Sequence, residues 1–122
     1  MADQHDLGKK GEEWAKKYLK EKSYEIKETN YKYMKAEVDI IALDKNTDEM
    51  VFVEVKTRYA SALEGVQQAV GKTKQRQIIK AAHRYIVSND LSNESRFDII
   101  WIILHPKGPE VQHISEAFYP TL

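Results

Sequence analysis

The pattern of apolar and polar positions divides the chain into helical and extended segments. Apolar residues recur every three or four positions over 8–22 and 72–88, which is typical of helices with one buried face. Four other stretches are rich in β-branched and aromatic residues and are separated by polar turn formers, which predicts strands. These stretches are 24–31, 37–43, 50–56 and 96–104.

The order of these elements predicts an α/β protein in which helices flank a central mixed β-sheet. The order is α-β-β-β-α-β, followed by an expected edge strand over 110–114 and a helical turn over 115–119. A short helix is also expected over 64–70. The stretch 96–104 is apolar on both faces, as in a strand that is covered on both sides. A chain of 122 residues is long enough for a core of its own, so 1–122 is expected to form a single domain.

Composition narrows the protein class. A hydrophobic content of 42% and a charged content of 31% are typical of soluble globular proteins. Cys is absent, which excludes disulfides and thiolate metal sites. The first residues lack the apolar core of a secretion signal, and the longest apolar run, 99–104, is too short to span a bilayer. We therefore expect a cytoplasmic protein with no membrane partner.

Two other motif classes can be set aside. The tripeptide Gly71-Lys72-Thr73 resembles the end of a phosphate-binding P-loop, but Val66 stands where that motif requires Gly. We therefore expect no nucleotide cofactor. The four His residues lack the spacing of zinc ligands.

The chemistry concentrates in the segment 37–56, which is expected to form a β-hairpin. If its polar turn closes symmetrically, Asp39 lies opposite Glu54, and Lys56 follows two residues later. Opposed like charges destabilise a sheet, so stability alone does not explain this pair. Converging carboxylates beside an ammonium group suit a divalent cation and a phosphate. The full register pairs Leu43 with Met50, Ile41 with Phe52, Asp39 with Glu54 and Glu37 with Lys56.

Two alternatives qualify this interpretation. A register slip of one residue would send Asp39 to the opposite face of the sheet. The three charged side chains could also form an exposed lattice of ion pairs with no catalytic role.

Net charge is zero, but the charges are unevenly distributed: acids dominate 37–54 and bases dominate 56–84. The second helix carries a basic ridge of Lys72, Arg76, Lys80 and Arg84, which would contact phosphates or would simply be the solvated face of the helix.

Glu12 falls near the buried stripe of the first helix. It would either point toward the hairpin carboxylates or complement the helix dipole at the rim of the stripe.

Asp39 followed by Glu54-Val55-Lys56 resembles the signature of restriction-endonuclease-like nucleases. Over nearly its full length the chain more narrowly resembles the YraN family of small bacterial proteins, which are assigned to that fold. The arrangement is also similar to archaeal Holliday-junction resolvases. The stretches that carry the resemblance are Gly8–Glu12, Glu37–Ala42, Val51–Arg58, Lys74-Gln75, Arg96–Asp98 and Glu116–Phe118.

This resemblance implies a restriction-endonuclease-like fold and a phosphodiester hydrolase that requires Mg²⁺ or Mn²⁺. Its substrate would be DNA or another nucleic acid, including branched or repair intermediates. Asp39, Glu54 and the Val55 carbonyl would bind the metal, and Lys56 and Glu12 would assist catalysis. The nucleic-acid contacts would come from Arg58, Lys72, Lys74, Gln75, Arg76 and Lys80.

Two other functions remain open from the sequence. One is a nucleic-acid-binding protein with a vestigial metal pocket, and the other is an assembly adaptor that binds neither metal nor nucleic acid. A single domain of 122 residues has little room for a separate target-reading module. We therefore expect selectivity to come from nucleic-acid shape, from a partner, or from a second subunit as in a homodimer.

Overall fold

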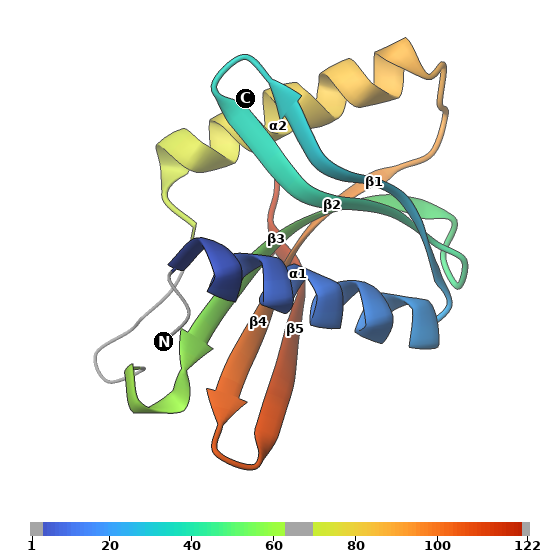
Figure 1. Cartoon of the computed structure of the whole chain (residues 1–122). Coiled ribbons are helices and arrows are strands. Elements are labelled where there is room, and N and C mark those ends of the chain that lie inside the picture. Colours follow the sequence, from blue (N-terminus) through green and yellow to red (C-terminus); the bar gives the residue numbers. More distant parts are fainter. Residues whose placement is uncertain (1–3, 63–69, 121–122) are drawn as a thin grey trace.

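The computed structural model describes residues 4–62 and 70–120, which form a five-stranded mixed sheet with a helix packed on each face (Figure 1). The observed order α-β-β-β-α-β-β confirms the predicted α/β class. The helix expected over 64–70 lies almost entirely outside the described residues. The elements are α1 (Gln4–Glu21), β1 (Tyr24–Tyr33), β2 (Ala36–Asp44), β3 (Glu49–Tyr59), a 3-10 turn (Ala60–Ala62), α2 (Lys72–Ser88), β4 (Ser95–His105) and β5 (Gly108–Phe118).

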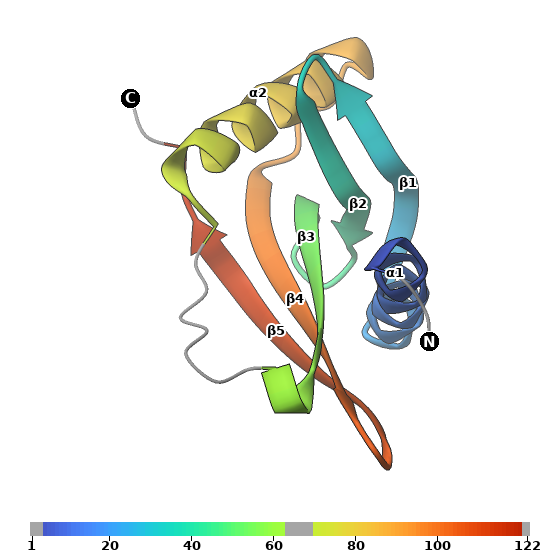
Figure 2. The same ribbon diagram turned by 60° about the vertical axis from the view of Figure 1, so that its left-hand side comes forward.

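The strands lie in sequence order, β1-β2-β3-β4-β5. β3 and β4 are parallel and the other neighbours are antiparallel. Parallel neighbours need a crossover, and α2 belongs to this connection. Figure 2 shows α1 almost end-on beside the sheet and α2 across its other side. Neither described helix has the length and apolarity needed to cross a lipid bilayer.

The sheet forks between β2 and β3. Their pairing runs from Asp44–Glu49 to Ile40–Val53, which confirms the predicted pairs Leu43–Met50 and Ile41–Phe52. Beyond that point β2 pairs only with β1, and β3 pairs only with β4. Figure 1 shows the two strands diverging toward the end of the molecule where the first turns of both helices lie.

The fork changes part of the predicted register. Asp39 and Glu54 are the first residues of β2 and β3 beyond the last ladder pair, rather than members of that ladder. Glu37 pairs with Lys32 of β1, and Lys56 pairs with Trp101 of β4, so the expected Glu37–Lys56 pair is replaced. The sequence pattern sets the register near the turn but carries no signal for where two strands separate.

Each face of the sheet buries its own apolar cluster. Under α2, the rings of Phe52, Phe97 and Phe118 stack in a row, with centroids 5.6 Å and 5.1 Å apart. On the opposite face of the sheet, Ala15 and Leu19 of α1 are fully buried. Both helices therefore bury the stripe that their periodicity predicts. α2 spans the predicted residues, whereas α1 begins four residues earlier than expected.

The expected helical turn over 115–119 is wrong, because β5 continues as an extended strand to Phe118. Two contacts hold it there. Phe118 buries its ring against Phe97, and the Glu116 backbone N–H donates to Asp98 Oδ1 at 3.1 Å. Glu116 adopts a left-handed backbone (φ 55°) at an irregularity in the β4–β5 pairing. These long-range contacts override the local preference.

A buried ion network ties all five strands and α1 together. The Arg96 guanidinium, 6% exposed, donates to Asp44 at 2.8 Å and to Asp98 at 3.0 Å. It also donates to Glu49 at 2.9 Å and to the Tyr24 hydroxyl. On its other side Asp98 accepts from His113 Nε2 at 2.6 Å. The Tyr18 hydroxyl of α1 lies 3.0 Å from His113 Nδ1. The network fixes the closed end of the β2–β3 hairpin.

At the open end, α1 comes very close to β3. A Cβ added to Gly11 would lie 1.7 Å from Thr57 Oγ1 and 2.9 Å from Thr57 Cβ. Only Gly permits this approach. The Thr57 hydroxyl is buried and has no hydrogen-bond partner among the described residues. The contact carries Glu12, the next residue of α1, toward the fork.

We predict that Gly11→Ala lowers the free energy of unfolding by about 1–3 kcal/mol, because the new methyl group forces α1 away from Thr57. Urea denaturation measures this change. The matched control is Gly8→Ala in the same helix, whose added Cβ meets nothing within 4 Å. The control should be neutral or stabilising by about 0.5–1 kcal/mol. Equal behaviour of the two variants would contradict the close approach.

Acid should destabilise the protein through the Arg96 network. Burial acts to raise the pKa of Asp98, but hydrogen bonds from His113 and Arg96 hold it below its ordinary value. The pKa of Asp44 is lowered in the same way by Arg96 and Asn46, again against the effect of burial. A carboxyl group with a lowered folded-state pKa stabilises the fold above its unfolded pKa, near 3.9, and this contribution is lost as the pH falls further.

We therefore predict that the free energy of unfolding decreases between pH 5 and pH 2. Asp98→Asn should destabilise the protein at pH 7 and flatten this decrease, which chemical denaturation across the pH range measures. An unchanged slope in the variant would contradict a role for Asp98 in acid stability.

Candidate active site

A cavity of about 570 Å³ opens at the fork. Its walls come from the β1–β2 turn, from β2 and β3, and from the first two turns of α2. Asp39 of β2 and Glu54 of β3 both face it, so the two predicted metal ligands share one solvent-accessible recess. The lining residues are Lys35, Ala36, Glu37, Asp39, Glu54, Gly71, Thr73, Lys74, Gln77 and Ile78.

Asp39 is held in place by the backbone of the neighbouring strand. Its Oδ2 accepts a hydrogen bond of 2.7 Å from the Val55 N–H. The β2–β3 ladder has already ended at this level, so the carboxylate satisfies an N–H that has no ladder partner on β2. The end of strand pairing therefore positions the carboxylate.

The two carboxylates repel each other across the recess. Burial, followed by the negative charge of Glu54, raises the pKa of Asp39 to about 7, and Glu12 adds to the rise. The Val55 N–H and Lys74 oppose it. Glu54 itself is only 7% exposed, and its Oε1 lies 2.6 Å from Lys74 Nζ. A buried and a half-buried acid thus lie close together at an electrostatic cost.

A polar bridge joins α1 to the rim of the cavity. The Asn30 side-chain amide donates to Glu12 Oε1 and to Glu37 Oε1, each at 3.1 Å. Asn30 has a left-handed backbone (φ 52°), which Asn tolerates better than most residues. It lies between the pairs Thr29–Ile40 and Tyr31–Val38, and so at the level of Asp39. The bridge fixes Glu12 near the two central carboxylates.

Lys56 lies beside the acids but does not line the cavity. Its Nζ is 5.6 Å from the centroid of the Trp101 ring. Burial lowers the pKa of Lys56, against the opposing effect of the Glu54 charge. Arg58 also lies over Trp101, at 5.9 Å, and donates to the Thr57 carbonyl at 2.8 Å. The cation that contacts Glu54 is therefore Lys74.

The other predicted nucleic-acid contacts on α2 lie in different places. Gln75 donates its side-chain amide to the Val70 carbonyl at 2.7 Å, so this amide binds the backbone just before α2 and not the carboxylates. Lys72 and Arg76 are exposed and line none of the described cavities near the fork. Lys80 lies farther along α2, in an adjoining groove. Only Lys74 of this set reaches the carboxylates.

The residues present fit a hard divalent cation. No group of three or more His, Cys, Asp or Glu side chains in the described ranges is arranged to hold a metal. A cation held here would have the carboxylates of Asp39 and Glu54 as ligands, with the Val55 carbonyl as the further ligand that the sequence predicts, and its other positions would be open to water or substrate. Mg²⁺ typically binds in this way, through one or two carboxylates together with substrate phosphates. The repulsion between Asp39 and Glu54 is also what a bound cation would relieve.

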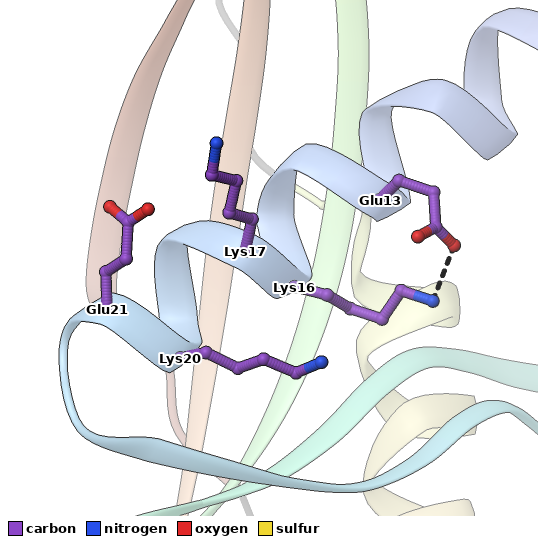
Figure 3. Close-up of a pocket in the computed structure, with 5 residues that line it drawn as sticks. All are labelled: Glu13, Lys16, Lys17, Lys20 and Glu21. Carbon is purple, nitrogen blue, oxygen red and sulfur yellow. Dashed lines mark ion pairs between the residues drawn. The ribbon is translucent and has the colours of Figure 1, made fainter.

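A separate recess of about 380 Å³ lies along the outer face of α1. Figure 3 shows its lining: Glu13, Lys16, Lys17, Lys20 and Glu21, with an ion pair of 2.6 Å between Glu13 and Lys16. All these side chains come from one helix, and Glu13 is largely exposed. This recess is the solvated face of α1 and has no part in the carboxylate cavity.

Comparison with known proteins identifies the relatives of the chain. Residues 11–102 match the model of "Uncharacterised protein family UPF0102". The chain belongs to this family. A UPF0102 protein of Christiangramia forsetii is 46% identical over 119 residues, which cover 98% of each chain. Another, from Flavobacterium psychrophilum, is 43% identical with the same coverage, and one from Geotalea uraniireducens is 44% identical over 96% of this chain and 92% of its own.

The matched residues of the UPF0102 model include Asp39 and Glu54. They also include Gly11 and Lys74, through which α1 and α2 contact the strands at the fork. Sequence reasoning nevertheless missed two residues of this site. Asn30 could have been noticed as an Asn inside a run of strand-forming residues. Trp101 gave no signal beyond its place in an apolar strand, because only the parallel β3–β4 pairing brings it under Lys56.

We predict that Asp39→Asn raises the free energy of unfolding by about 1–3 kcal/mol when it is measured in EDTA near pH 8, because it removes one of two repelling charges and keeps the acceptor for Val55. Mn²⁺ should stabilise the wild type by about 2.7 kcal/mol at 100 times its dissociation constant and should not stabilise the variant.

Thermal and urea denaturation measure both effects. The control is Asp48→Asn, which changes an exposed turn residue whose left-handed backbone suits Asn. Equal responses of Asp39→Asn and Asp48→Asn to Mn²⁺ would contradict the cation site.

Proposed function

We propose that this protein is a nuclease that hydrolyses phosphodiester bonds of DNA with the help of Mg²⁺ or Mn²⁺. One observation carries the proposal: Asp39 and Glu54 meet at the fork of the sheet, in a cavity that opens to solvent beneath the first turns of α2. A sheet gains no stability from two like-charged side chains that are at least half-buried at this place. A site for a divalent cation explains them.

The carboxylate oxygens of Asp39 and Glu54, with the Val55 carbonyl, would hold the cation. When bound there, a divalent ion supplies Lewis-acid chemistry: it polarises a phosphate oxygen and lowers the pKa of an attacking water. Asp39 is pre-positioned for this task by the Val55 N–H. Glu54 would exchange its contact with Lys74 for the ion, which frees the ammonium group for a phosphate.

The remaining groups would orient the substrate. The N-terminus of α2 begins at Gly71 without a side-chain cap, and Gly71 lines the cavity. Helix N-termini of this kind bind phosphate through their free N–H groups. Lys56, half-buried beside the acids, would orient the attacking water or offset charge that develops on the phosphate. Glu12, held by Asn30, would bind a water or a second ion.

The strand order and the spacing of Asp39, Glu54 and Lys56 support kinship with restriction-endonuclease-like nucleases. This kinship raises the expectation of cleavage chemistry.

A second candidate function is a nucleic-acid-binding protein without catalysis. The observation that favours it is the Lys74–Glu54 ion pair of 2.6 Å, because an ammonium group already neutralises one proposed metal ligand. In that case Lys74 would hold the cavity in a metal-free form, and basic side chains along α2 would account for binding.

We predict metal-dependent cleavage of DNA by the wild-type protein, tested on branched, nicked and single-stranded substrates with Mg²⁺ or Mn²⁺. Asp39→Asn and Glu54→Gln should each lower the cleavage rate by about 100-fold or more, because each removes a charged ligand. Gel electrophoresis of labelled DNA measures the rate, and gel shift in EDTA measures binding separately.

The matched control is Glu25→Gln, which changes an exposed β1 side chain paired with Lys27, outside the cavity. It should cleave at the wild-type rate. Binding by all variants without metal-dependent cleavage would overturn the nuclease proposal in favour of the binding protein. Cleavage that survives in Asp39→Asn would place the activity elsewhere or in a contaminant.

A further inference from the structure

The carboxylate cavity continues into a longer groove. Three cavities, of about 570, 170 and 660 Å³, lie in a row between α2 and the β1–β2 turn. The first and second share Lys35, Ala36 and Gln77 as lining residues. The second and third share Tyr33, Met34 and Lys80. The same side chains thus bound neighbouring cavities, and we call the three together the α2 groove.

One straight stripe of α2 forms a wall of this groove. Thr73, Gln77, Lys80 and Arg84 are spaced by four, three and four residues, so they share one helix face. The stripe extends about 16 Å at 1.5 Å per residue. The basic ridge expected from the sequence, with a repeat of four, winds around the helix by ~40° per step. This winding explains why Lys80 and Arg84 line the groove while Lys72 and Arg76 do not.

The α2 groove combines positive charge with exposed apolar surface. The second and third cavities are lined by the cations Lys35, Lys80 and Arg84, and no carboxylate is among their described lining residues. Met34, at the turn, is 84% exposed. The Arg84 guanidinium lies 5.8 Å from the centroid of the Tyr33 ring. The groove therefore combines cations with the flat Tyr33 ring and the apolar Met34 side chain.

We propose that the α2 groove holds an unpaired nucleic-acid strand that leads away from the carboxylate cavity. This inference rests on the proposed function, and it specifies the substrate as one with a single-stranded arm next to the cleaved bond. The cations would contact phosphates, and the Met34, Tyr33 and Arg84 surfaces would stack on bases. At ~3.4 Å per stacked nucleotide, the groove accommodates about five nucleotides.

An unpaired strand fits the groove better than a duplex does. A duplex presents phosphates outward and hides its base faces, so it would leave Met34 and the neighbouring Ile79 without a role. A single strand offers both phosphates and base faces to one narrow groove. The continuity with the carboxylate cavity gives such a strand a direct path to Asp39 and Glu54.

Binding in EDTA tests the proposal without dependence on cleavage. Fluorescence anisotropy should show that the wild type binds a labelled 10-nucleotide single strand at least about 10-fold more tightly than a blunt duplex of equal length. The double variant K80Q/R84Q should lose about 10-fold or more in affinity for the single strand. Its slope of log affinity against log salt should fall in magnitude by about 1.4, the value for two lost phosphate contacts. Met34→Ala should weaken binding without changing this slope.

Two controls remove the same number of charges elsewhere. K45Q/K107Q changes two exposed turn residues that do not line the groove. K72Q/R76Q changes two residues of α2 that do not line the groove either. Both should lose clearly less affinity than K80Q/R84Q. Equal losses in all three double variants, or a larger loss in K72Q/R76Q, would overturn the groove assignment.

Size-exclusion chromatography decides between a strand and a second copy of the chain as the occupant. A dimer that Met34→Ala dissociates, with unchanged affinity for the single strand, would overturn the proposal. The cleavage assay stays separate from this test. Selective binding in the groove without cleavage would contradict the nuclease function alone. Cleavage by the wild type, together with wild-type binding by K80Q/R84Q, would contradict the groove assignment alone.

Discussion

The structure depends on the point at which β2 and β3 stop pairing. Up to Ile40–Val53 the two strands form an ordinary antiparallel hairpin, and beyond it each strand follows a different neighbour. Asp39 and Glu54 are the next residues on either side of this point. Separation leaves room for a solvent-accessible cavity between them, while the hairpin keeps them close enough to repel.

The rest of the fold holds the fork open in one geometry. At the closed end, Arg96 joins the hairpin turn to β4 through a buried ion network, which fixes the register. At the open end, Gly11 lets α1 pack directly on Thr57, and Asn30 links the same helix to the cavity rim. Stabilising contacts thus surround a pair of acids that repel each other, as expected when a site is selected for binding or chemistry.

Sequence patterns were sufficient for the parts of the structure that are governed by local periodicity. The bounds of α2, the buried helix faces and the hairpin register near Leu43 and Met50 follow from spacing alone. Long-range contacts decided the rest. β5 stays extended because Phe118 stacks on Phe97, and the partner of Glu54 is Lys74 rather than the Lys two residues along its own strand, because α2 returns over the fork. No local pattern encodes these approaches.

The most direct test of the account is a crystal structure of the protein soaked with Mn²⁺, in which anomalous scattering locates the ion. We expect a single peak within ligand distance, ~2.2 Å, of carboxylate oxygens of both Asp39 and Glu54, with the Lys74 ammonium displaced from its 2.6 Å contact. An absent peak at saturating Mn²⁺, or a peak at other residues with the Lys74–Glu54 ion pair intact, would contradict the central claim that the fork is built to hold a cation.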